Sequence, residues 1–209
     1  FGHPSRSLTV VGVTGTNGKT TTASLIAAVL ESDGTPTGII GTLTGKHTTP
    51  EAPELQAQLA QFVADGKRAV VMEVSSHALA LHRVDGTHFA LAVFTNLGRD
   101  HLDLHGTVER YFAAKAALFE PSLSEQGVVN SDDVRGRLLL DAASIPMTPF
   151  SHTDIDDLVV TPTSHEYSWR GQHVTVGIGG AFNAMNSLAA ATAAAALGVQ
   201  PNVIAAGLR

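Results

Sequence analysis

The chain has 209 residues, of which 44% are hydrophobic and 15% charged, and this suits one α/β domain with a full core. Its net charge is −6 and no basic run is present, so we expect no nucleic-acid partner. Without cysteine, neither a disulfide framework nor a cysteine zinc site is possible. No apolar run approaches the roughly 20 residues that a membrane span requires. We therefore expect a cytoplasmic protein without a membrane partner.

A phosphate-binding loop is predicted at residues 10–22, where the chain reads V-V-G-V-T-G-T-N-G-K-T-T-T. An apolar run at residues 8–13 predicts a buried strand, two glycines break it, and an amphipathic helix follows. The glycines let backbone N–H groups turn inward, and the helix N-terminus adds a partial positive charge. Lys19 can then reach the outer phosphates, and the Thr20 hydroxyl can bind magnesium. The alternative is an ordinary tight turn between a strand and a helix.

The remaining pattern alternates strands with helices. Strands are expected at 37–41, 69–74, 89–94 and 127–130, helices at 54–65, 75–81, 107–119, 134–143, 181–197 and 202–209, and an antiparallel hairpin within 159–178. This order predicts an α/β fold like that of P-loop NTPases, with a mostly parallel sheet and helices on both faces. Ligands of such sheets bind beyond the carboxyl ends of the strands.

Three polar clusters fall at predicted strand ends: the phosphate loop, residues 73–77 and residues 95–105. In a parallel sheet they would converge on one edge. Glu73 ends an apolar strand, where burial of an acid is costly unless it meets a cation. Magnesium beside a triphosphate is the expected cation. A helix cap or an arginine partner is the alternative for Glu73.

Other polar residues have plainer interpretations when taken singly. Within R-D-H-L-D-L-H an aspartate is the favoured metal ligand, since magnesium prefers oxygen. Asp103 and His105 are expected only to cap the next helix. Lys115 alone would be a solvated surface charge, and Asn183 and Asn186 would be polar caps.

Five motifs in order resemble the central ATPase domain of the Mur ligases, which build the peptide stem of the bacterial cell wall. They are G-T-N-G-K-T-T at 15–21, M-E-V-S-S-H-A-L at 72–79, T-N-L-x-R-D-H-L-D at 95–103, Y-x-x-A-K at 111–115 and F-N-x-x-N at 182–186. The T-T-P-E loop at 48–51, with S-S-H-A-L and Arg83, resembles the MurE type. That type adds the third amino acid to UDP-N-acetylmuramoyl-dipeptide.

The resemblance implies roles for particular residues. The implied nucleotide-binding residues are Gly15, Thr16, Asn17, Gly18, Lys19, Thr20, Thr21 and Asn183, the last as the adenine contact. The implied magnesium ligands are Thr20, Glu73, His101 and a carbamylated Lys115, which replaces the expectation of an aspartate. Lys19, Glu73, His101 and Lys115 form the implied catalytic set. Thr48, Thr49, Ser75 and Arg83 are the implied contacts of the nucleotide-sugar dipeptide.

The family mechanism uses ATP and Mg²⁺. ATP phosphorylates the dipeptide carboxylate, and the amine of diaminopimelate or lysine attacks the acyl phosphate. Residues 1–209 correspond to the central domain, and we expect an excised domain without the uridine-binding and C-terminal ligase domains that flank it in the family. The alternatives are a non-catalytic nucleotide-binding fragment or paralogue, another Mur ligase or a folylpolyglutamate synthetase relative. A P-loop switch protein or kinase is a further alternative.

Overall fold

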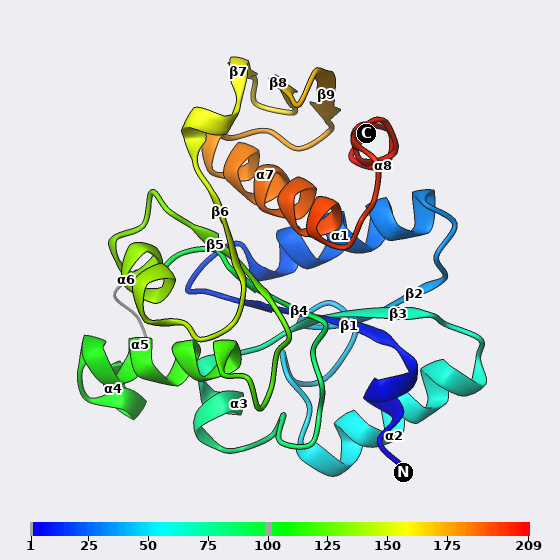
Figure 1. The fold of residues 1–209 in the computed structure, drawn as a ribbon, viewed down its shortest axis with the longest axis vertical. Helices are drawn as coiled ribbons and strands as arrows, with labels where there is room; N and C mark the ends of the chain where they lie inside the picture. Colours follow the sequence, from blue (N-terminus) through cyan, green and yellow to red (C-terminus); the bar gives the residue numbers. More distant parts are fainter. Residues whose placement is uncertain (1, 99–101) are drawn as a thin grey trace.

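The computed structural model describes residues 2–98 and 102–209, and its centre is a parallel sheet (Figure 1). The six strands are β1 (Thr9–Thr14), β2 (Thr37–Ile40), β3 (Ala69–Glu73), β4 (Leu91–Phe94), β5 (Gly127–Asn130) and β6 (Met147–Phe150). Their order is β2-β3-β1-β4-β5-β6, and every neighbouring pair is parallel. The predicted α/β fold is confirmed.

Helices cover both faces of this sheet (Figure 1). One face carries α1 (Lys19–Ser32), α7 (Ala181–Ala196) and α8 (Pro201–Gly207). The other carries α2 (Ala52–Ala64), α3 (Ser76–Ala80), α5 (Val108–Ala116) and α6 (Val134–Ala142), with the short α4 (Leu102–His105) beside α5. Because both faces are covered, the central strands are almost wholly apolar, as the sequence predicted.

A second, antiparallel sheet lies over α7. It consists of β7 (Asp156–Val160), β8 (His165–Trp169) and β9 (Gln172–Val176). The predicted hairpin is β8–β9, and it turns at Arg170 and Gly171, whose φ angles of 47° and 74° match a two-residue turn of the I′ kind. Tyr167 and Trp169 from this sheet share one apolar core with Leu188 of α7.

Three differences from the predicted elements have physical causes. β6 was not predicted, because M-T-P-F contains a proline that only an edge strand tolerates. β7 adds a third strand to the predicted hairpin. The strand predicted from 89 begins at Leu91, since Phe89 forms only an isolated bridge with Ser124. Within the described ranges, no helix combines the length and apolar character that crossing a membrane requires.

Candidate functional site

The loop after β1 is held against the end of β4. The N–H of Thr16 donates to the Asn96 carbonyl (2.9 Å), and the N–H of Asn17 donates to Asn96 Oδ1 (3.0 Å). Asn96 Nδ2 and Thr95 Oγ1 both donate to the Asn17 carbonyl, at 3.0 and 2.6 Å. Two of the three predicted polar clusters therefore meet at the carboxyl edge of the sheet. Because the N–H groups of Thr16 and Asn17 both donate to Asn96, these two groups hold the loop in shape.

Two glycines of this loop have conformations that other residues rarely adopt. Gly15 has a φ of 151° and Gly18 a φ of 88°. A Cβ added at Gly15 would lie 1.9 Å from Thr95 Oγ1, and one added at Gly18 would lie 2.2 Å from Asn186 Oδ1. The glycines thus permit both the turn and the close approach of β4 and α7 to the loop.

The N-terminus of α1 completes the loop. The helix begins at Lys19 after the N-cap Gly18, and the N–H of Thr22 donates to the Gly18 carbonyl (2.9 Å). The N–H groups ahead of Thr22 point out of the helix end, as at any helix N-terminus. Such a terminus is a ready anion site. Lys19 Nζ folds back over the loop and donates to the carbonyls of Gly15 (3.1 Å) and Thr16 (3.0 Å). The ammonium therefore lies beside the atoms that would cradle a phosphate.

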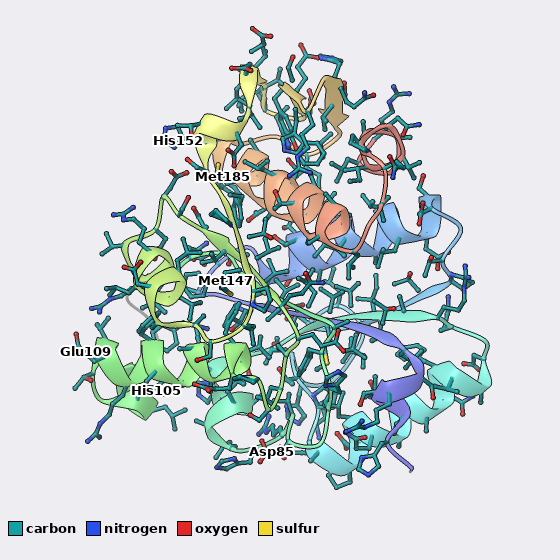
Figure 2. The ribbon with its side chains drawn as sticks, in the orientation of Figure 1. Asp85, His105, Glu109, Met147, His152 and Met185 are labelled. Carbon is teal, nitrogen blue, oxygen red and sulfur yellow. The ribbon has the colours of Figure 1, made fainter. Side chains whose placement is uncertain are left out.

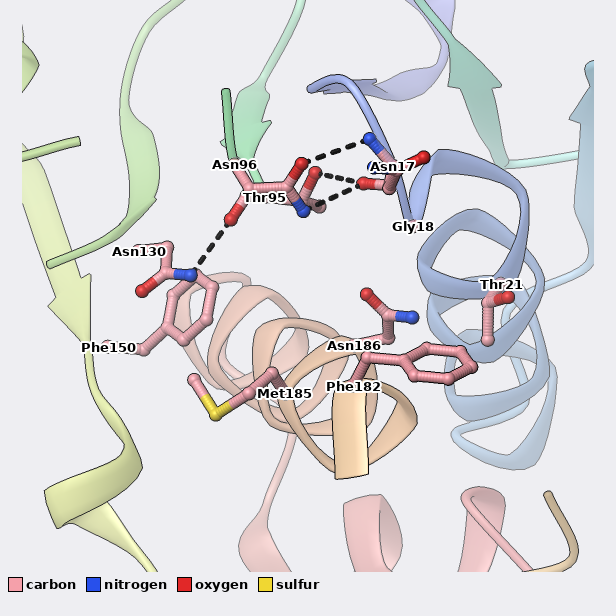
Figure 3. Close-up of a pocket in the computed structure, with 10 residues that line it drawn as sticks. All are labelled: Asn17, Gly18, Thr21, Thr95, Asn96, Asn130, Phe150, Phe182, Met185 and Asn186. Carbon is pink, nitrogen blue, oxygen red and sulfur yellow. Dashed lines mark hydrogen bonds between the residues drawn. The ribbon is translucent and has the colours of Figure 1, made fainter. Parts of the chain in front are cut away.

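A cavity of about 640 Å³ opens on one side of the loop (Figure 3). It is lined by Asn17, Gly18, Thr21, Thr95, Asn96, Asn130, Phe150, Phe182, Met185 and Asn186. We call it the amide cavity, because four of these side chains are asparagine amides and none of the ten is charged. Phe182 lines it while 72% of the residue's surface is exposed. This mixture of apolar surface and neutral donors and acceptors suits a flat heteroaromatic base.

Asn183 does not line the amide cavity. Its Nδ2 donates to the Gly179 carbonyl (2.7 Å), while its Oδ1 accepts from Asn186 Nδ2 (3.0 Å). Asn186 is on the cavity wall, and Asn183 orients it. The expectation that the two amides are helix caps is wrong, because the N-cap of α7 is Gly180 and no side chain caps that helix.

A second cavity of about 360 Å³ lies on the other side of Lys19. It is lined by Lys19, His47, Thr48, Thr49, Ser75, His77 and Arg83, and we call it the basic cavity. All four residues predicted to contact the nucleotide-sugar dipeptide are among them. These residues come from the start of α1, the loop between β2 and α2, the segment from the end of β3 into α3, and the turn after α3 that carries Arg83.

Thr49 and Arg83 organise the basic cavity. Thr49 Oγ1 donates to the Glu73 carbonyl (2.9 Å) and accepts from the N–H of Ser75 (3.0 Å). Arg83 Nη1 donates to the Thr49 carbonyl (3.3 Å), and its Nη2 forms an ion pair with Glu51 at 2.6 Å. Arg83 Nε is buried and has no hydrogen-bond partner within the described residues. A buried donor of this kind is a position for an acceptor on a bound ligand.

Glu73 and Thr20 line a third, smaller cavity of about 140 Å³. Glu73 is 2% exposed, and its carboxylate accepts from the N–H (2.8 Å) and the hydroxyl (3.3 Å) of Thr42. Those contacts are neither a helix cap nor an arginine pair, so that alternative is wrong. A hydroxyl and a carboxylate on one small cavity are the hard oxygen donors that magnesium prefers. These two residues fit the predicted metal.

Lys115 is 1% exposed, so the expectation of a solvated surface charge, made for it singly, is wrong. Its Nζ donates to the Gly15 carbonyl (2.9 Å) and lies 4.7 Å from the centre of the Tyr111 ring. Tyr111 in turn places its hydroxyl 3.0 Å from Thr16 Oγ1. Lys115 therefore contacts the phosphate loop directly.

His105 is also not a cap. It is buried at the end of α4, beside α5 (Figure 2), and its Nε2 lies 3.0 Å from Ser76 Oγ. Thr107 caps α5 instead by accepting from the N–H of Arg110 (3.2 Å). His101 and the side chain of Asp103 lie outside the described residues. Elsewhere in the described ranges, no three histidine, aspartate or glutamate residues gather closely enough to hold a metal.

The sequence predictions left out several residues that line the cavities. They are Thr95, Asn96, Asn130, Phe150, Phe182, Met185 and Asn186 in the amide cavity, and His47 and His77 in the basic one. A usable signal existed for Asn96 and Asn130, because both are polar residues at or just beyond the carboxyl end of an apolar strand.

Comparison with known proteins places this fold in one family. The model of the Mur ligase middle domain matches residues 13–194. A Streptomyces avermitilis protein named UDP-N-acetylmuramoyl-L-alanyl-D-glutamate–2,6-diaminopimelate ligase is 44% identical over 229 aligned residues, which take in 100% of this chain and 45% of that protein. A Gloeobacter violaceus protein of the same name is 46% identical over 230 residues, again 100% of this chain and 46% of the relative. The chain thus spans about half the length of these relatives.

A solved structure of a ligase with that name agrees. It superposes with a TM-score of 0.84 at 32% identity, over 96% of this chain and 46% of the other. The resemblance inferred from the five motifs is confirmed by these matches. With its phosphate loop, its parallel sheet and a match over residues 13–194, this chain belongs to the Mur ligase middle-domain family.

Proposed function

We propose that this chain is the ATP-binding domain of a MurE-type ligase, which joins an amino acid to UDP-N-acetylmuramoyl-dipeptide. The position of Lys19 carries the proposal. The phosphate loop contributes Asn17 and Gly18 to the amide cavity, and the next residue, Lys19, lines the basic cavity. A nucleotide in the first cavity and a carboxylate in the second would therefore meet at Lys19. That arrangement suits transfer of a phosphoryl group from one to the other.

Each part of the site has a role in such a transfer. The amide cavity holds the base, and the first turn of α1 holds the phosphates. Lys19 balances the charge that develops on the moving phosphoryl group. Thr48, Thr49, Ser75 and Arg83 orient the acceptor so that its carboxylate faces the terminal phosphate. The acyl phosphate that results is then attacked by the amine of the incoming amino acid. The names of the relatives favour diaminopimelate as that amino acid.

Thr20 and Glu73 would hold Mg²⁺, which supplies charge neutralisation between the phosphates. Lys115 as an ammonium would repel a cation. After loss of one proton, its Nζ amine would add to carbon dioxide and release a second proton to give an anionic carbamate, which is an oxygen ligand. In the structure the Nζ contacts the Gly15 carbonyl. Together with His101 this completes the proposed ligand set.

Titration of the chain with ATP and Mg²⁺ by calorimetry tests the proposal. Lys19→Ala is expected to weaken ATP binding by roughly 100-fold, because a charge-assisted contact to phosphate is lost. Lys67→Ala is the matched control, since Lys67 forms only a surface ion pair with Glu31 (3.4 Å). Equal ATP affinity in the wild type and the Lys19 variant would contradict the proposal.

A second candidate function is nucleotide binding without catalysis. It concerns residues 1–209 by themselves, which correspond to 45–46% of the length of these relatives. We expect ATP binding but negligible ligation by these 209 residues unless the remaining domains are supplied. Chromatography would detect the products. If the chain alone forms ADP and an amide product, this second candidate is ruled out.

A further inference from the structure

A buried hydrogen-bond cluster joins the small antiparallel sheet to α7, behind the wall of the amide cavity. Its members are His165 and Tyr167 on β8 and Ser187 on α7, exposed by 1%, 0% and 0%. His165 Nε2 lies 2.8 Å from Ser187 Oγ, and the Tyr167 hydroxyl lies 3.0 Å from the same atom. The His165 and Tyr167 rings are nearly parallel, 9° apart, with centres 6.0 Å from each other.

The protons of this cluster can be placed from its partners. His165 Nδ1 lies 2.6 Å from the Ile178 carbonyl, which only accepts, so Nδ1 carries a proton and donates. Burial lowers the pKa of His165 below its ordinary value, which keeps the ring neutral and leaves Nε2 as an acceptor. Ser187 accepts from Tyr167, and its single hydroxyl proton has two acceptors within reach, His165 Nε2 and the Ala184 carbonyl (2.9 Å). Burial raises the pKa of Tyr167 to about 12, so its hydroxyl keeps the proton that it donates.

The two hydrogen-bond partners of His165 lie on either side of Asn183 and Asn186 in the sequence. One bond holds Ile178, just before the Gly179 carbonyl that accepts from Asn183. The other holds Ser187, the residue after Asn186. Asn183 orients Asn186, and Asn186 Oδ1 lies so close to Gly18 that a Cβ there would be 2.2 Å away. Figure 3 shows the Asn186 amide directed toward Gly18 of the loop, while Phe182 points toward Thr21 and Met185 toward Phe150.

We propose that His165 is a positioning residue for the nucleoside: through Ile178 and Ser187 it sets the rotation and start of α7, so that the Asn183–Asn186 pair faces the phosphate loop. The inference rests on the proposed function, because it assumes that the amide cavity receives the base of ATP. His165 itself does not line that cavity. Its effect on binding must therefore pass through α7 and must concern the nucleoside rather than the phosphates.

Comparison of ATP with inorganic tripolyphosphate tests this division. His165→Leu removes both bonds and is expected to weaken ATP about tenfold, while tripolyphosphate binding changes less than about twofold. In the ligand-free variant, the side-chain amide NMR signals of Asn183 and Asn186 are expected to shift. His165→Asn can place an amide donor near the position of Nδ1 and is expected to restore part of the ATP affinity. Tyr167→Phe, which leaves both His165 bonds in place, is the matched control.

The outcomes separate the inference from the function on which it rests. If the wild type binds ATP and His165→Leu loses both ligands equally, or neither, the positioning role is wrong. If the wild type fails to bind ATP, the proposed function is wrong, and the asparagine signals of the ligand-free variants still decide whether His165 positions the pair. If His165→Leu does not fold, Ser187→Ala takes its place, because it removes the bond to His165 Nε2: unchanged asparagine signals with unchanged ATP affinity in that variant would overturn the inference.

Discussion

The amide cavity and the basic cavity share one loop, but one is lined by neutral residues and the other by charged ones, so they suit different ligands. The ten residues around the amide cavity carry no charge, whereas the basic cavity contains Lys19, Arg83 and two histidines. Neutral amides and apolar surface distinguish ligands by shape and by hydrogen-bond pattern. Fixed cations attract phosphates and carboxylates of many shapes. One side of the loop is therefore suited to selecting a base, and the other to orienting an anionic acceptor.

The two cavities also differ in how their walls are held. The amide cavity is walled by ends of strands and by a 16-residue helix, α7, with the His165 cluster behind it. The basic cavity is walled by the loop between β2 and α2 and by α3, which has only five residues. Thr49 and Arg83 hold that loop by a few hydrogen bonds. Rigid recognition thus lies on one side of Lys19 and adaptable recognition on the other.

The largest expected effect is that of Gly15→Ala, which would disrupt the loop shared by the two cavities. Gly15 has a φ of 151°, and a Cβ there would strike Thr95 Oγ1 at 1.9 Å. Its carbonyl also accepts from both Lys19 and Lys115. We expect loss of about 2–4 kcal/mol of unfolding free energy from backbone strain and overpacking, with loss of measurable ATP binding. Denaturant unfolding and calorimetry measure the two effects.

Gly34→Ala provides the matched control. Gly34 also has a positive φ, 74°, but nothing lies within 4 Å of a Cβ added there. This variant is expected to lose about 1 kcal/mol from the left-handed conformation alone and to bind ATP normally. An equal loss of stability in the two variants would show that the contact of Gly15 with β4 contributes nothing.

The sequence predicted the loop and most of the sheet because these are local patterns. The strand at Thr9–Thr14, the two glycines and the helix from Lys19 all follow from neighbours within a few residues. The predicted convergence of strand ends needed only the rule that parallel strands share an edge. Thr48, Thr49 and Ser75 of the T-T-P-E and S-S-H-A-L motifs, expected at one site with Arg83, line one cavity with it for the same reason.

Burial of single polar residues could not be predicted in this way. Lys115 meets the Gly15 carbonyl across 100 positions of sequence, and His105 meets Ser76 across 29. The helical pattern around Lys115 is identical for a surface and a buried lysine. The role of His165 was likewise invisible, because its partners come from α7 and from the linker before it. Such contacts exist only once the sheet has brought the segments together.

Arg83→Lys separates the basic cavity from the amide cavity. The change keeps the charge but loses the fork that reaches both Glu51 and the Thr49 carbonyl, and it removes the buried Nε. The affinity for UDP-N-acetylmuramoyl-dipeptide is expected to fall about tenfold. NMR titration of the ATP-loaded chain measures this affinity. ATP affinity is expected to stay the same. Arg137→Lys is the control, because Arg137 makes a similar contact to the Ser131 carbonyl on the exposed surface (2.8 Å). If ATP affinity falls together with dipeptide affinity, the cavities are not independent.

The smallest expected effect is the response of the amide-cavity wall to pH. Burial lowers the pKa of His165 in the folded chain, so as pH falls below about 6.5 the unfolded chain takes up the proton first. The stabilisation from the neutral ring is therefore complete above about pH 6.5 and is lost as pH falls toward the lowered pKa. The pKa values of Glu31, Glu109 and Asp132 are lowered from ordinary values of 4.5, 4.5 and 3.8, so their contributions are lost only in more acidic solution.

Between pH 7 and 5 the unfolding free energy of the wild type should fall more steeply than that of His165→Asn, measured by urea unfolding at each pH. If the unfolding free energies of the two proteins fall with equal slopes, protonation of His165 does not weaken its cluster. The wall of the amide cavity would then be held by apolar packing alone.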